Sequence, residues 1–348
     1  MAARLLGIVM ALAGAAALAA ALIPPHEARW VVDDPRRGTH ATGLAVQAGE
    51  PVVAVQDGLI WALRQEWEAL PSLPESLAPT GLFAGPELLA TTTDGVYRLD
   101  DDGWHRLAGS AAPRARISHL HRHGEQLAAG GRDGVWLRDA AGAWNHLGQP
   151  ADGRPVYRVL LSSDGAVEHL RAGSIDAGIH LRISDADGTA SDWIPDNEGL
   201  PHPVNILSMR QLDDGTLLAG TDQGLYRQGA AFEPWQSVPG PIDQRRVLAL
   251  TRVDDRLLLG SDDGVWQTGL DEAGALAAEP AWRRIPAAEG GLDAGVAWIE
   301  EAGPDIFASA STVYRLTDER PVEWYILVIA GPLALLAGVW FARPRRSR

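Results

Sequence analysis

The sequence predicts an all-β protein, a seven-bladed β-propeller whose ring is closed by its N-terminal strand. Two observations carry this prediction. A short phrase returns along the chain about every 40 residues, and a tryptophan follows it in most of the repeats. Units of four short strands at this period are typical of propellers, whereas helical repeats would show a 3.6-residue periodicity that is absent here.

The recurring phrase is a short apolar strand that follows an Asp-Gly or similar turn, as in DGVYR, DGVWLR, QGLYR and DGVWQ. Six copies align on Gly58, Gly95, Gly134, Gly178, Gly224 and Gly264, and a seventh has Thr312 in place of the glycine. Asp-Gly between apolar residues is a hairpin signal, so each copy is expected to begin the third strand of a blade.

The clearest complete unit covers residues 245–286. It divides into four apolar runs, VLAL, RLLLG, GVWQT and AWRRI, which are separated by an Asp-Asp turn, an Asp-Asp-Gly turn and a longer loop. We therefore expect four antiparallel strands per unit.

A tryptophan marks the expected fourth strand of each blade. Six of these residues are Trp67, Trp104, Trp144, Trp193, Trp235 and Trp282, and the seventh, Trp30, precedes the first complete unit. The N-terminal strand is therefore predicted to complete the last blade, whose other strands should lie between residues 295 and 316. This closure leaves no free sheet edge and brings both ends of the propeller to one face.

Both chain ends carry apolar segments of 19 residues without a charge, Leu5–Ile23 and Trp324–Ala342. Each is close to the length needed to cross a bilayer. We expect residues 1–23 to form a transmembrane anchor, with a cleaved signal peptide as the alternative, and residues 324–342 to form a transmembrane helix. The arginines of the tail 343–348 place it in the cytoplasm, so the propeller, residues 28–320, is expected in the periplasm at a bacterial inner membrane.

Composition excludes several classes of function. The 348-residue chain has no cysteine, which excludes disulfides, cysteine-bound zinc and thiol catalysis. Its formal net charge of −15 argues against nucleic acid as a partner.

The phrases GTDQGLYR, TTTDGVYR and GSDDGVW resemble the two-component-regulator propeller repeat of exported sensor domains. They are also similar to the repeats of photosystem-assembly propellers and to sialidase-type Asp boxes. The resemblance covers residues 29–320 and implies a propeller with a sensing or assembly role. Two departures from these families weaken the implied sensing or assembly role. SDDGVW is one residue short of the Asp-box spacing, and no signalling domain is expected after the last apolar segment.

Arginines are frequent in the loops that lead into first strands, and we expect these loops to meet at the membrane-distal mouth of the central channel. The residues are Arg114, Arg116, Arg154, Arg158, Arg245 and Arg246. Guanidinium groups bind carboxylates and phosphates bidentately, so this cluster is the predicted binding site. The alternative is ion pairing with acidic residues of neighbouring loops.

The stretch ISHLHRHGE places His119, His121 and His123 on one side of a first strand, facing the channel. Three imidazoles could hold a metal, but their spacing on a flat strand is too wide to converge on one ion. A polar channel wall is the favoured interpretation, and no cofactor is predicted.

No nucleophile–base motif is found in the sequence. The favoured function is therefore a non-enzymatic, membrane-tethered periplasmic propeller. It would act as a scaffold, an assembly factor or a sensing subunit, with a membrane or periplasmic protein or a small anionic ligand as its partner. The alternative is an exported hydrolase or lyase with its site at the channel mouth.

Overall fold

The computed structural model describes residues 28–35, 40–109, 111–163, 165, 167–185, 187–287, 292 and 295–317. Contacts divide the chain into two units, Met1–Arg29 with Thr317–Arg348, and Trp30–Leu316. Every regular element among the described residues is a β-strand, so this part of the chain holds no helix able to cross a membrane. The segments 1–23, 324–342 and 343–348 lie outside the described residues.

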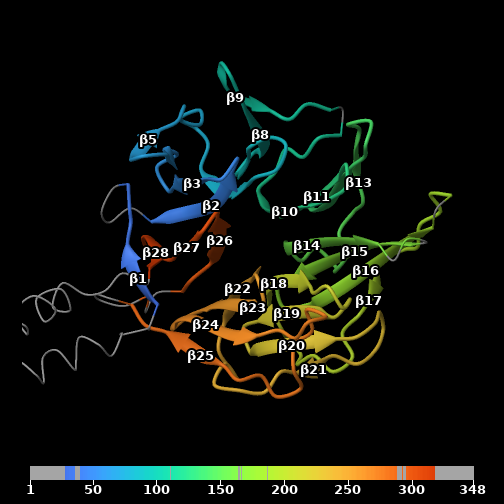
Figure 1. Cartoon of the computed structure of the whole chain (residues 1–348). Coiled ribbons are helices and arrows are strands. Elements are labelled where there is room, and N and C mark those ends of the chain that lie inside the picture. The colour runs from blue at the N-terminus through green and yellow to red at the C-terminus, as the bar shows by residue number, and fades with distance from the viewer. Residues whose placement is uncertain are drawn as a thin grey trace, which may run out of the picture. The chain divides into compact units, whose positions relative to one another are not determined.

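The strands form seven antiparallel four-stranded sheets around a central channel, which confirms the predicted propeller (Figure 1). Three sheets come first along the chain: β2 (Ala41–Gln47), β3 (Glu50–Val55), β4 (Ile60–Leu63) and β5 (Trp67–Ala69); β6 (Pro79–Phe83), β7 (Leu89–Thr92), β8 (Gly95–Asp100) and β9 (Gly103–Arg106); β10 (Ile117–His123), β11 (Gln126–Gly131), β12 (Gly134–Arg138) and β13 (Trp144–His146). Three more follow: β14 (Val156–Ser163), β15 (Val167–Ser174), β16 (Gly178–Asp185) and β17 (Ile194–Pro195); β18 (Ile206–Gln211), β19 (Leu217–Thr221), β20 (Gly224–Gln228) and β21 (Gln236–Ser237); β22 (Val247–Val253), β23 (Arg256–Ser261), β24 (Gly264–Gly269) and β25 (Arg283–Ile285).

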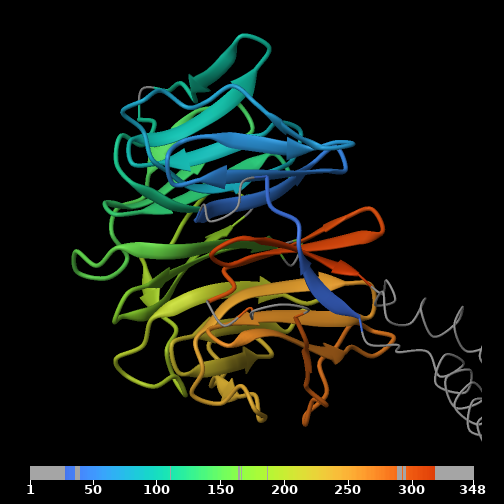
Figure 2. The ribbon, with the colours of Figure 1, turned by 90° about the vertical axis from the view of Figure 1, so that its left-hand side faces the viewer.

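The seventh sheet joins the two ends of the propeller. It combines β26 (Trp298–Ala302), β27 (Asp305–Ser309) and β28 (Val313–Thr317) with β1 (Arg29–Val32), in the order β1-β28-β27-β26. Both views show β1 beside the last strands of the chain (Figures 1 and 2). The amide of Asp33 donates to the carbonyl of Val313 at 3.0 Å, and Arg315 forms an ion pair with Asp33 at 3.1 Å. The predicted N-terminal strand closure is therefore confirmed.

The position of the closing strand shows which strand ends lie on which face of the ring. The end of β1 lies beside the start of β28, so β1 begins and β28 ends on the same face. Because neighbouring strands of each sheet are antiparallel, the innermost strands also end on that face. The opposite face carries the N-terminal ends of the innermost strands and the loops that lead into them.

The recurring glycine has a structural cause, which is clearest at the starts of β12 and β8. Gly134 has φ of +116°, and a Cβ there would lie 2.2 Å from the carbonyl oxygen of Gly148. Gly95 has φ of +111°, and its Cβ would lie 2.4 Å from the carbonyl oxygen of Pro113. The turn needs a backbone conformation that favours glycine, and the segment leading to the next blade packs directly against it.

The fourth-strand tryptophans join neighbouring blades. The indole N–H of Trp104 donates to the carbonyl of Pro71 at 2.7 Å, and that of Trp235 donates to the carbonyl of Asp196 at 3.0 Å. In both cases the acceptor lies one or two residues after the outer strand of the preceding blade. The periodic tryptophan seen in the sequence thus packs between blades, where apolar clusters form most of the core.

Candidate functional site

The central channel is the main concave feature of the described propeller. Three cavities of about 270, 510 and 690 Å³ line up along it and share residues of the innermost strands. His119 borders all three, Arg158 borders the first two, and Glu300 borders the last two. The cavities are therefore successive sections of one channel, which runs from the N-terminal ends of the inner strands to their C-terminal ends.

Six of the seven inner strands shift their register after the first residue, which is the mark of a β-bulge. A bulge leaves one residue unpaired and redirects its side chain. The residues that follow the first position are Thr42, Thr80, Ser118, Tyr157, Leu207 and Leu248, and all of them line the cavity of about 270 Å³. The bulges thus build a ring of side chains around this opening, which we call the arginine mouth for the residues described next.

Three arginines line the arginine mouth: Arg116, Arg158 and Arg246. Arg116 directly precedes β10 and Arg246 directly precedes β22, whereas Arg158 follows the bulge of β14. None of the three forms an ion pair with a carboxylate of the described residues. Three guanidinium groups therefore face one opening without an internal counter-charge in this part of the chain.

Arg158 is the innermost of the three. Its guanidinium donates to the carbonyl of Tyr157 at 2.9 Å and lies 5.3 Å from the centre of the Tyr157 ring. Burial in the channel lowers the pKa of Arg158 to about 10, so the group remains a cation at neutral pH. A desolvated guanidinium of this kind binds a planar anion strongly.

The structure brings together only half of the six arginines that the sequence suggested. Arg114 is exposed and does not border the channel cavities. Arg154 forms an ion pair with Asp176 at 3.3 Å, and Arg245 forms one with Asp263 at 3.0 Å. These two arginines match the alternative interpretation of the sequence, in which loop arginines neutralise neighbouring acids.

The histidines of β10 line the channel, as expected, but two of them have a structural partner. Nδ1 of His119 accepts the amide N–H of Val159 at 3.4 Å, and Nδ1 of His121 accepts that of Leu161 at 3.1 Å. These amides belong to the inner edge of β14. With Nδ1 as acceptor, a neutral imidazole carries its proton on Nε2 and has no free lone pair for a metal.

Burial also keeps both of these imidazole rings uncharged. It is the main cause that lowers the pKa of His119 well below its usual value and that of His121 to about 4. Both rings are therefore neutral at physiological pH. His123, the last residue of β10, is exposed, and no group of three possible ligands is arranged for a metal ion within the described part of the chain.

The same arrangement recurs around the channel. The hydroxyl of Ser208 donates to the carbonyl of Val247 at 3.1 Å, and the hydroxyl of Thr251 donates to that of Ile299 at 2.7 Å. In each case an inner-strand side chain satisfies a backbone group on the inner strand of the next blade. Polar residues of the inner strands thus protect edges that have no strand partner.

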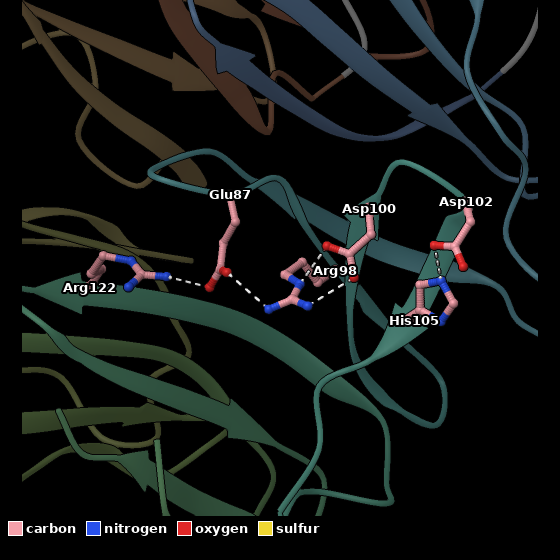
Figure 3. A network of polar contacts seen from close by, with 6 residues as sticks. All are labelled: Glu87, Arg98, Asp100, Asp102, His105 and Arg122. Carbon is pink, nitrogen blue, oxygen red and sulfur yellow. Dashed lines mark hydrogen bonds and ion pairs between the residues drawn. The ribbon is translucent and has the colours of Figure 1, made fainter. Parts of the chain in front are cut away.

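At the other end of the channel, two of the three lining arginines, Arg122 and Arg252, have acidic partners, whereas Arg210 forms no ion pair within the described residues. Arg122 forms an ion pair with Glu87 at 3.3 Å, Glu87 lies 3.7 Å from Arg98, and Arg98 pairs with Asp100 at 2.8 Å (Figure 3). Arg252, which also lines this end, forms an ion pair with Asp213. The contrast with the arginine mouth makes the mouth the stronger candidate for an anionic ligand.

Sequence reasoning missed one channel residue with unusual chemistry. Glu300 lies on β26, and burial raises its pKa to about 7, although Arg210 acts in the opposite direction. The signal available in the sequence was its position: Glu300, His121 and Arg210 are equivalent residues of the repeat, each four places after a fully buried residue, namely Val296, Ile117 and Ile206. Aligning the first strands, in addition to the third, would have placed them in the channel.

The comparisons with known proteins show the fold and not the family. No protein-family model matches the chain, and no curated protein matches it in sequence. The chain is similar in structure to the extracellular domain of a hybrid two-component system from B. thetaiotaomicron, with a TM-score of 0.64 and 12% identity over 85% of this chain and 42% of that one. This chain therefore spans less than half of that neighbour.

Two further solved structures cover most of both chains. BamB from Moraxella catarrhalis has a TM-score of 0.53 and 14% identity, over 79% of this chain and 84% of that chain. A chain of the mitotic checkpoint complex has a TM-score of 0.60 and 16% identity, over 83% and 92%. At such identities the similarity is one of fold, and functions differ widely on one fold. The chain is thus a seven-bladed β-propeller, and its narrower resemblance to a sensor or sialidase family stays a prediction.

Proposed function

We propose that the protein is an exported, membrane-tethered propeller that binds an anionic ligand or an anionic group of a partner protein at the arginine mouth, without catalysing a reaction. The observation that carries the proposal is a set of three guanidinium groups around one cavity, Arg116, Arg158 and Arg246, none of which pairs with a carboxylate of the described residues. The chain has 45 acidic residues, so internal partners for these groups are abundant. Their exposure to the channel is consistent with a ligand that supplies the counter-charge.

Membrane attachment rests on the sequence. The two apolar end segments and the basic tail favour an inner-membrane protein with a periplasmic propeller and a cytoplasmic C-terminus. The ends of the propeller leave from the face opposite the arginine mouth. A propeller tethered in this way would present the mouth to the periplasm, where a soluble ligand or a partner domain could reach it.

A binding role also agrees with the environment of the channel histidines. The Nδ1 atoms of His119 and His121 are occupied by backbone amides, so neither ring offers a free lone pair for proton abstraction. The proposal therefore assigns the channel to recognition.

The test replaces the three mouth arginines together by glutamine in the full-length protein, purified in detergent from bacterial membranes. Bound proteins and small molecules are then identified and quantified by mass spectrometry. Arg114→Gln is the matched control, because Arg114 lies in the loop of Arg116 but outside the mouth. We expect the triple variant to lose the bound partner or ligand and the control to retain it.

Retention by a folded triple variant would contradict the proposal. If the triple variant does not fold, the single change Arg158→Gln is used instead. Recovery of a chemically converted ligand, rather than an unchanged one, would favour the alternative of an exported hydrolase or lyase.

A further inference from the structure

A basic and an acidic side chain, neither of which forms an ion pair within the described residues, share the cavity of about 510 Å³. Arg158 lies on β14 and Glu300 lies on β26, and both border this cavity. In the ring, two sheets separate β14 from β26 on one side and three on the other. The two charges therefore come from opposite walls of the channel, at the greatest separation that seven blades allow.

Neither group forms an ion pair within the described residues. The cation closest in effect to Glu300 is Arg210, and its guanidinium donates to the carbonyl of Leu250 at 3.5 Å. A buried charge is costly when it is unpaired, and burial accordingly raises the pKa of Glu300. Two such groups facing one cavity indicate a ligand that satisfies both.

The two charges also differ in depth. Arg158 borders the shallow cavity of the arginine mouth, whereas Glu300 borders the cavity of about 690 Å³ at the other end. A ligand entering from the mouth would thus meet the cation first and the carboxylate further inside.

The cavity between them suits a small organic molecule. Its volume lies within the range of about 300–1,000 Å³ that is usual for such sites. Phe83, Met209 and Trp298 supply apolar wall, and His119 borders the same space with its protonated Nε2 available as a neutral donor. Polar ends and an apolar middle are therefore both accommodated.

We propose that the channel binds a small zwitterion, an α-amino acid or a short peptide, with its carboxylate on Arg158 and its ammonium group on Glu300. The assignment rests on the proposed function, since it names the ligand of the same mouth. A simple dianion would meet the carboxylates of Glu300 and Glu301, and a polyamine would meet the guanidinium of Arg158. A molecule with one charge of each sign meets neither repulsion.

The test measures binding of three matched pools of tripeptides to the full-length protein, by native mass spectrometry and equilibrium dialysis. One pool has free ends, one is N-acetylated and one is C-amidated. We expect the free pool to bind at least tenfold more tightly than either modified pool. Phosphoethanolamine is a fourth probe, and binding of this molecule in preference to the peptides would overturn the choice of a carboxylate.

Variants assign each end of the ligand. Glu300→Gln should weaken binding of the free pool at least tenfold and leave binding of the N-acetylated pool unchanged. Arg158→Gln should also weaken binding of the free pool at least tenfold, but it should leave binding of the C-amidated pool unchanged. Glu66→Gln is the control, because it removes the same charge from the turn between β4 and β5, far from the channel. The modified pools keep the test valid if a variant does not fold.

The outcomes separate this inference from the proposed function. Equal binding of free and N-acetylated pools, or no effect of Glu300→Gln, would overturn the zwitterion while arginine-dependent binding could still hold. If either of these results were found and the triple arginine variant also bound its ligand as the unchanged protein does, both the zwitterion inference and the proposed function would be overturned.

Discussion

Replacing Trp30 by alanine tests whether the N-terminal strand closes the ring. The Trp30 side chain is 0% exposed and packs in a cluster that includes Val265, Ile285 and Ile306. Burying a tryptophan removes roughly 200 Å² from water, which at about 25 cal/mol per Å² amounts to about 5 kcal/mol. Its indole N–H has no hydrogen-bond partner, which offsets about 1–2 kcal/mol of that gain. We therefore expect Trp30→Ala to cost about 3–4 kcal/mol.

The matched control is Trp282→Ala, in the outer part of the neighbouring blade. Trp282 is only partly buried, so we expect about half the effect of Trp30→Ala. Far-UV circular dichroism of the full-length protein in detergent would follow unfolding. The midpoint of thermal unfolding should fall by about 10 °C for Trp30→Ala. An unchanged midpoint for Trp30→Ala, together with a lower one for Trp282→Ala, would refute the closure.

Three further predictions follow from the fold. A reporter enzyme fused after Arg348 should be active only in the cytoplasm and one inserted in the loop 270–279 only in the periplasm; the reverse pattern would contradict the topology. Because the pKa of His121 is lowered to about 4, its contribution to stability should be complete above pH 6.5 and be lost as the pH falls toward 4. Denaturant unfolding should show this slope, and His121→Gln should flatten it; an equal slope in the variant would rule out the histidine as its source. Gly134→Ala should destabilise the protein by at least about 1 kcal/mol more than Gly103→Ala, because both glycines have positive φ but only Gly134 faces a carbonyl within 4 Å; equal melting temperatures would contradict this reason.

The fold was predictable because its signals are local and repeated. The turn glycine of each third strand and the tryptophan of each fourth strand recur in every blade with few exceptions, and their spacing alone sets the number of blades. Even the closure was readable, since Trp30 has no other place in the series. These features depend on hairpin chemistry and on packing between neighbouring blades.

The site was only partly predictable because ion pairs depend on distant residues. Arg154 and Arg158 lie in one short stretch, and nothing in its sequence distinguishes the two arginines. Arg154 nevertheless forms an ion pair with Asp176, whereas Arg158 faces the channel. The role of His119 likewise depends on an amide of the next blade, at Val159. Such partners are set by the register of the inner strands, which the sequence pattern leaves open.

The most direct test of the arginine mouth is a high-resolution density map of the full-length protein with the free tripeptide pool bound. The proposed recognition predicts a carboxylate within about 3 Å of the Arg158 guanidinium. It also predicts that the rest of the ligand extends into the channel toward Glu300. A saturated ligand bound elsewhere, with only water beside Arg158, would contradict it.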